Sequence, residues 1–289
     1  MPWLIRVGWS SPVSELRYLL AHNRLTVVAT AMFVLLLVCA VAGPAWVPFD
    51  PLSTQPAIAF QPPTATHPFG TDQLGRDVFS RVVIASRLDL LIAATAVVLS
   101  LTLGTTIGAT IGYFGGLLDS SVSRVVDVVM AFPLFVLAMA TVAALGNSVS
   151  SIVYATAIIN LPFYIRLARA ETGIRRHLAY VEAAYIGGSG HGRILRAILI
   201  PNIMPPLVVQ ASLNLGWAVL NAAGLSFLGL GVQAPTPEWG VMVAEGAQFI
   251  VSGRYWLTLF PGLALMLAVF CFNLLGDGLR DIVDPSHRT

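Results

Sequence analysis

The chain has 289 residues, of which 56% are hydrophobic and 10% charged, whereas a typical soluble domain is about 25% charged. This composition cannot cover a globular surface in water, and a formal net charge of only +2 gives no support to nucleic-acid binding. All 16 basic residues are arginine, so the chain lacks the lysine that a phosphate-binding loop or a Schiff base requires.

The chain begins with arginines that precede a long apolar run. Arg6, Arg17 and Arg24 come before the run from Leu25 to Phe49. This run is longer than the apolar core of about 7–15 residues in a secretory signal peptide, so we interpret it as a retained membrane span. The sequence therefore predicts an N-terminal segment over residues 1–25 and a first transmembrane helix over residues 26–47.

Further apolar stretches, long enough for crossings of about 20 residues, follow the polar segment 48–89. One of them, Val128–Ile165, is long enough for two crossings, with a turn signal at Gly146-Asn147-Ser148 between them. We therefore predict an all-α polytopic membrane protein with six transmembrane helices, the last five forming a core domain over residues 90–289. These five helices are expected near residues 90–112, 124–145, 149–170, 203–226 and 256–277.

The arginines are distributed unequally between the two sides of this predicted bundle. Twelve lie on the side that holds the N-terminus, and four, Arg76, Arg81, Arg87 and Arg254, lie on the other. Because cytoplasmic segments of membrane proteins carry the excess of positive charge, both termini are predicted to be cytoplasmic. Segment 48–89 is then an extracytoplasmic loop, and the segment at about 171–202 faces the cytoplasm.

The fifth predicted span carries an unusual set of polar side chains. Gln210, Asn214, Trp217 and Asn221 are spaced i, i+4, i+7 and i+11, which places them on one face of a helix. Because amides are costly in hydrocarbon, this face is expected to meet protein or water. The face has two interpretations: the wall of a translocation path suited to a peptide-like solute, or hydrogen bonding between helices.

Few other residues within the predicted spans could carry chemistry. Cys39 and Cys271 are typical of small buried hydrophobes, and the five histidines are too scattered to form a metal site. No carboxylate or histidine lies at mid-span, so a secondary transporter driven by protons lacks its usual groups. We find no paired nucleophile and base that would indicate an enzyme. Arg124 and Asp127, three residues apart, are expected to form a local ion pair.

The cytoplasmic segment at about 171–202 interrupts the apolar runs on either side of it. A helix is predicted from Arg175 to Ile186, broken by Gly187-Gly188-Ser189-Gly190. A short amphipathic helix from Arg193 to Ile200 would follow, ended by Pro201. A helix, a hinge and a second helix are suited to docking in a groove of another protein, although a lipid-surface loop would also account for the arginines.

The residues of this segment match a known signature. Glu182-Ala183-Ala184, Gly188, Ile198 and Pro201 resemble the EAA signature of ABC importer permeases. The chain resembles the dipeptide/oligopeptide/nickel importer permeases, specifically the shorter "C-type" member of a two-permease pair. The resemblance extends from about Leu16 to Pro285. Four further stretches carry it: HPFGTDQLGRDVFSR from His67, GYFGG from Gly112, LSFLGLGVQAPTPEWG from Leu225 and FNLLGDGLRDIVDP from Phe272.

This resemblance implies a type I ABC importer permease fold and a set of partners. They are a second permease subunit, two cytoplasmic ATPase subunits that use ATP and Mg, and an extracytoplasmic solute-binding protein. The chain itself would be non-catalytic and hold neither metal nor cofactor, in a bacterial inner membrane. Dipeptides or oligopeptides are the expected cargo, with haem or a metal chelate as the alternative and an ATPase-independent transporter less favoured. The residues implied in ATPase coupling are Glu182, Ala183, Ala184, Gly188, Arg193, Ile198 and Pro201.

Three positions depart from the family pattern. His191 stands where an acid is common, Gly192 where an aromatic is common, and Ile200 where leucine is usual. We expect Glu182 to fix the segment against the arginines near it. The helix that begins at Arg193 is expected to present its apolar side to a groove of the ATPase.

Overall fold

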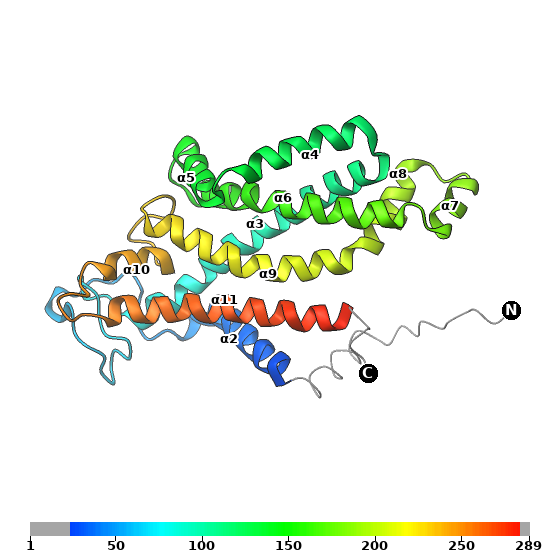
Figure 1. Cartoon of the computed structure of the whole chain (residues 1–289). Coiled ribbons are helices and arrows are strands. Elements are labelled where there is room, and N and C mark those ends of the chain that lie inside the picture. The colour runs from blue at the N-terminus through cyan, green and yellow to red at the C-terminus, as the bar shows by residue number, and fades with distance from the viewer. Residues whose placement is uncertain (1–23, 284–289) are drawn as a thin grey trace.

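The computed structural model describes residues 24–283, so most of the predicted N-terminal segment 1–25 lies outside the described residues. The described part is helical, with a single isolated β-bridge between Thr71 and Asp77. Long helices run side by side and shorter ones close the two ends (Figure 1). The α-helices are α2 (Arg24–Trp46), α3 (Val78–Phe114), α4 (Gly116–Ala131), α5 (Leu134–Leu145), α6 (Val149–Arg175), α7 (Ala179–Ile186), α8 (His191–Arg193), α9 (Ile200–Phe227), α10 (Trp239–Ala247) and α11 (Trp256–Val283).

Five helical segments are long and apolar enough to cross a membrane, and a sixth crossing is possible if a bent pair counts as one. The five contain α2, α3, α6, α9 and α11, which confirms the predicted all-α bundle. The third predicted span, 124–145, is not one straight helix: α4 and α5 meet at a bend of 93°. The reason is Pro133, which lacks a backbone N–H and holds Phe132 in an extended conformation.

The second predicted span begins earlier than expected. The span was predicted to begin at residue 90, directly after a loop over residues 48–89. In the structure, α3 begins at Val78. The side chain of Asp77 caps this helix, since its Oδ2 accepts a hydrogen bond from the Ser80 backbone N–H at 2.7 Å. The last residues assigned to the extracytoplasmic loop therefore belong to a helix.

Helices α3 and α6 pack closely because glycine recurs along their contact. Gly104, Gly108 and Gly112 lie four residues apart on α3 and face the backbone of α6. A Cβ atom at Gly108 would lie 2.4 Å from the carbonyl oxygen of Ile165, so only glycine allows this approach. The pair forms the centre of the bundle, with α9 and α11 beside it (Figure 1).

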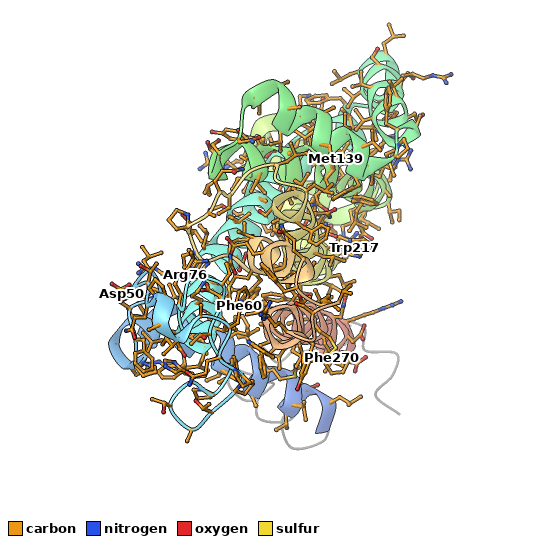
Figure 2. The ribbon with its side chains drawn as sticks, turned by 90° about the vertical axis from the view of Figure 1, so that its left-hand side faces the viewer. Asp50, Phe60, Arg76, Met139, Trp217 and Phe270 are labelled. Atoms are coloured by element: carbon orange, nitrogen blue, oxygen red, sulfur yellow. The ribbon has the colours of Figure 1, made fainter. Side chains whose placement is uncertain are left out.

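Buried ion pairs fasten the end of the bundle that holds α10 and residues 47–77. Arg76 and Arg81 are each 1% exposed. Arg76 Nε lies 2.5 Å from Asp72 Oδ2, and Arg76 Nη2 lies 3.3 Å from Glu245 Oε2 on α10. In Figure 2, Arg76 lies with Asp50 and Phe60 on one side of the molecule, well apart from Met139 on α5. The motif that begins at His67 therefore includes the charges that tie this segment to α10.

Candidate functional site

The four polar and aromatic residues predicted on the face of the fifth span line one cavity. Gln210, Asn214, Trp217 and Asn221 all project from α9 into a space of about 490 Å³. Leu134 and Phe135 of α5 form another part of its wall. The structure thus brings together the residues that sequence spacing placed on one face.

The amides of this cavity are only partly satisfied by the protein. Gln210 Nε2 donates to Asn214 Oδ1 at 3.0 Å, and Asn221 Nδ2 donates to the Trp217 carbonyl oxygen at 2.9 Å. Asn214 is 4% exposed and lies beside the buried Tyr164 hydroxyl, and neither its Nδ2 nor that hydroxyl has a hydrogen bond of normal geometry among the described residues. Buried polar groups without good hydrogen bonds are costly, so these two groups can gain from a polar partner on a solute or on another chain.

Two further amides in the cavity were not singled out from the sequence. Asn160 comes from α6 and Asn273 from α11, and both line the cavity with the α9 residues. Each is an uncharged polar residue inside a predicted span, which is the signal that could have identified it. All the described lining residues are uncharged, so the cavity offers neutral donors, acceptors and aromatic faces.

The predicted glycine-rich break in the segment 171–202 is confirmed. Helix α7 ends at Ile186, and Gly188 adopts a φ of +81°, a conformation that favours glycine. The backbone N–H of Ser189 donates to the Ala184 carbonyl oxygen at 3.0 Å, which closes the end of the helix. Within the signature, Ala184 is half-buried, whereas Glu182 and Ala183 are exposed.

The predicted break at Pro201 is wrong. One continuous helical segment runs from His191 to Phe227, passing through a π-helical turn over Ile194–Leu199 into α9. Pro201 lies in the first turn of α9, where the widened turn before it accommodates a residue without an N–H. Arg193 is exposed and Ile198 half-buried, both on this continuous segment.

The apolar side of that segment does not face outward, contrary to prediction. Ile194 and Leu199 are both 0% exposed and pack against Val181 of α7. Because the helix continues into α9, its apolar residues are held against the chain's own core. The exposed apolar residues of this region lie on α7 instead, where Tyr185 is 59% and Ile186 85% exposed.

Glu182 does not hold the segment against nearby arginines, so that prediction is also wrong. Among residues 24–283 it forms no ion pair. The arginines have other partners: Arg175 bonds to Glu171, and Arg176 Nη1 donates to the carbonyl oxygens of Gly112 and Tyr113 at 3.2 and 3.1 Å. The Glu182 carboxylate is left exposed for another molecule.

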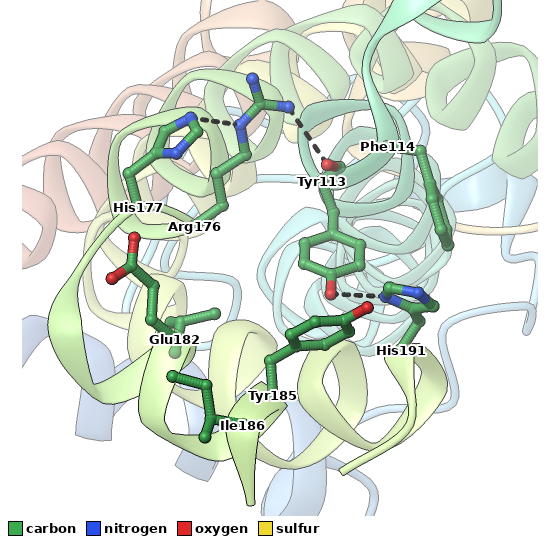
Figure 3. Close-up of a pocket in the computed structure, with 9 residues that line it drawn as sticks. Tyr113, Phe114, Arg176, His177, Glu182, Tyr185, Ile186 and His191 are labelled. Atoms are coloured by element: carbon green, nitrogen blue, oxygen red, sulfur yellow. Dashed lines mark hydrogen bonds between the residues drawn. The ribbon is translucent and has the colours of Figure 1, made fainter. Parts of the chain in front are cut away.

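A groove of about 600 Å³ lies between α7 and the end of α3. His191 closes one side of it, with Nδ1 2.8 Å from the Tyr113 hydroxyl and its ring stacked on Tyr185 at 5.5 Å (Figure 3). His191, a departure from the family pattern, therefore contacts its own chain. Glu182 and Ile186 also line this groove.

The expected ion pair between Arg124 and Asp127 does not form. Asp127 Oδ1 instead lies 2.7 Å from Arg166 Nη2 on α6. Arg169 of the same helix pairs with Asp119. Both pairs link α4 to α6, because α4 packs along α6 and places its carboxylates beside those arginines.

The bundle, the amide-lined cavity and the hinged segment together define a membrane permease. A family model described as "Binding-protein-dependent transport system inner membrane component" matches residues 104–289. A second model, "N-terminal TM domain of oligopeptide transport permease C", matches residues 11–63. The first match covers more than half of the chain, and the chain belongs to the ABC importer permeases of the dipeptide/oligopeptide/nickel family.

Curated relatives match along nearly their whole length. The dipeptide transport system permease protein DppC of Alkalihalophilus pseudofirmus is 42% identical over 96% of this chain and 91% of its own. The probable D,D-dipeptide transport system permease protein DdpC of Escherichia coli is 39% identical, over 94% of this chain and 91% of its own. The nickel transport system permease protein NikC of Escherichia coli is 38% identical, over 89% and 92%.

Proposed function

We propose that this permease forms half of the translocation path of an ATP-driven importer for dipeptides or oligopeptides. The observation that carries this proposal is the cavity, whose amides come from three different helices. Neutral donors and acceptors match the peptide groups of a short peptide, and the aromatic rings offer apolar contact to its side chains. Two relatives bear names of dipeptide permeases, which supports the same cargo.

The second half of the path would come from another permease. Trp217 is 61% exposed although it lines the cavity, so the cavity is open on that side in the single chain (Figure 2). A second permease covering this side would enclose the solute. We place the importer in a bacterial inner membrane with both termini cytoplasmic, and a solute-binding protein would deliver cargo from the opposite side.

Coupling to ATP hydrolysis is assigned to the segment 171–202. We propose that two cytoplasmic ATPases supply the ATP and Mg chemistry, while this chain is non-catalytic and binds no cofactor or metal. One ATPase would dock on the groove between α7 and α3, contacting the exposed side chains of Glu182 and Ile186. The shape of α7 and of the hinge after it would depend on Ala183, Ala184 and Gly188. Movement of the segment 171–202 would reach α9 through Arg193, Ile198 and Pro201.

The test replaces the cavity amides in the complete importer. A triple variant, Gln210→Leu, Asn214→Leu and Asn221→Leu, should lose at least about tenfold in dipeptide uptake, which corresponds to one or two lost hydrogen bonds. Subunit assembly and basal ATPase activity should stay unchanged. Val208→Leu, an exposed α9 residue outside the cavity lining, is the control.

Uptake is measured in proteoliposomes with a labelled dipeptide, a haem and a nickel chelate as parallel cargoes. Unchanged dipeptide uptake in the triple variant would mean that the amide face serves hydrogen bonding between helices and not transport. Uptake of haem or the nickel chelate alone would keep the permease role and replace the proposed cargo.

A further inference from the structure

Two acidic side chains are buried together at the end of the bundle that holds α10. Asp89 lies on α3 and is 1% exposed, and Glu238 precedes α10 and is 0% exposed. The Trp239 backbone N–H that Asp89 binds belongs to the residue next to Glu238, so the two carboxyl groups are neighbours. Neither residue belongs to the cavity or to the coupling segment, so the transport function proposed above leaves this pair unexplained.

The hydrogen bonds that position the pair come from backbone N–H groups, and the Ser226 side chain of α9 also lies close to Glu238. Asp89 Oδ2 accepts from the Trp239 N–H at 3.1 Å, and Glu238 Oε2 accepts from the Val241 N–H at 2.7 Å. Glu238 Oε1 is buried and has no hydrogen-bond donor among residues 24–283. Ionised carboxylates only accept hydrogen bonds, so a bond between these two requires a proton on one of them.

A nearby arginine could neutralise the pair in place of this proton, but in the described residues the arginines point away from Asp89 and Glu238. On α3, Arg87 is exposed. Arg81 Nη1 donates to the carbonyl oxygens of Pro51 and Pro235, and its Nε and Nη2 lie 3.8 and 3.7 Å from carboxylate oxygens of Asp72 and Glu245. Helix α9 has no charged residue, and the arginines of α6 begin at Arg166, toward the opposite end of the bundle. The acid of α10, Glu245, is paired with Arg76. Two adjacent buried negative charges without a cation would be strongly destabilising.

We propose that Asp89 and Glu238 share one proton and that this proton-bearing hydrogen bond fastens α10 to α3. Two neighbouring contacts hold the same junction. Trp239 Nε1 donates to the Val82 carbonyl oxygen at 2.9 Å, and a Cβ at Gly240 would lie 2.1 Å from the Ala223 carbonyl oxygen. Glu238, Trp239 and Gly240 thus join α10 to both α3 and α9.

A shared proton makes the junction sensitive to pH in one direction. Burial raises the pKa of the Glu238 carboxyl, so the folded chain holds this proton more tightly than the unfolded chain. The stabilisation is therefore complete at low pH and is lost as the pH rises through the folded-state pKa. Ionisation of the second carboxyl would leave two like charges in contact and loosen α10.

The amide variants Glu238→Gln and Asp89→Asn test the proton directly. In Glu238→Gln the amide oxygen can still accept from the Val241 N–H, while the amide N–H₂ donates to Asp89 without a titratable proton. The purified importer in lipid is examined by infrared spectroscopy at neutral pH for the carbonyl stretch of a neutral carboxylic acid. This stretch should be present in the parent and lost in either variant. Asp50→Asn, an exposed carboxyl of the same end, should leave it unchanged.

Thermal unfolding of the same samples over mildly acidic to alkaline pH gives a second readout that does not depend on transport. The parent should lose stability toward alkaline pH, and Glu238→Gln should remove most of that loss. Absence of any variant-sensitive carboxylic acid stretch would overturn the shared proton. A parent stabilised by sodium ions instead of by low pH would replace the proton by a bound cation and also overturn the proposal.

Discussion

The two ends of the bundle differ in where their charged side chains lie: one end buries them in ion pairs, and the other exposes them. At the end with α10, Arg76, Arg81 and Asp72 are buried and joined in ion pairs. At the end with α7, Glu182 is exposed and forms no ion pair with residues 24–283, and apolar Ile186 is 85% exposed. Removing one partner of a buried ion pair strongly destabilises the fold, whereas removing an exposed charged group changes its stability very little. The first end is therefore held together by buried charges, whereas the second exposes a charged and an apolar side chain at its surface.

The largest expected effect on stability comes from breaking the buried ion cluster. Arg76→Met would leave Asp72 and Glu245 without their closest guanidinium partner and should cost about 3–5 kcal/mol of unfolding free energy. Arg166→Met is the matched control, because it breaks an exposed pair with Asp127 and should cost less than about 1 kcal/mol. Both are measured by reversible SDS unfolding of the purified chain. Equal losses would contradict the contrast between the two ends.

A smaller effect is expected where a glycine is in close contact. Gly240→Ala should cost about 1–3 kcal/mol, because its Cβ would collide with the Ala223 carbonyl oxygen. In Gly188→Ala the added Cβ meets no atom of the described residues within 4 Å, so the variant should cost about 1 kcal/mol, from its positive φ alone. The same unfolding assay compares them. If Gly188→Ala were the more damaging of the two, the hinge would be more tightly packed than the α10 junction.

The contact between Tyr113 and His191 should contribute less again. Tyr113→Phe removes one exposed hydrogen bond and keeps the ring, so about 0.5–1 kcal/mol should be lost. Hydrogen exchange of the α7 amides should become faster, while amides of α10 keep their protection. Unchanged exchange in α7 would mean that the Tyr113 hydroxyl does not restrain the coupling segment.

The smallest effect on stability is expected at Glu182. Glu182→Lys should leave the unfolding free energy within error, since the side chain is exposed and has no ion-pair partner in the described part of the chain. Uptake by the assembled importer should fall at least about tenfold if this carboxylate contacts the ATPase. Glu171→Lys serves as the contrasting variant, because Glu171 pairs with Arg175 and its loss should reduce stability. Normal uptake with Glu182→Lys would remove Glu182 from the coupling surface.

Residue spacing was sufficient to predict one face of the amide-lined cavity. Gln210, Asn214 and Asn221 share that face because helical periodicity is a local property of the chain. The positive φ at Gly188 was predictable for the same reason, since a glycine-rich break after a helix favours it. The cavity itself was not predictable, because Asn160 and Asn273 reach it from helices whose packing depends on contacts distant in sequence.

The sequence by itself determined the membrane class, the number of apolar segments, the amide face and the hinge, since each follows from composition or from local periodicity. Only the tertiary structure decided that α4 and α5 bend by 93° at Pro133 and that the helix continues past Pro201. It also decided that Ile194 packs inward and that Asp89 meets Glu238 across 149 positions of chain. Such outcomes depend on which surfaces and charges the other helices bring alongside, and no short stretch of sequence records that information.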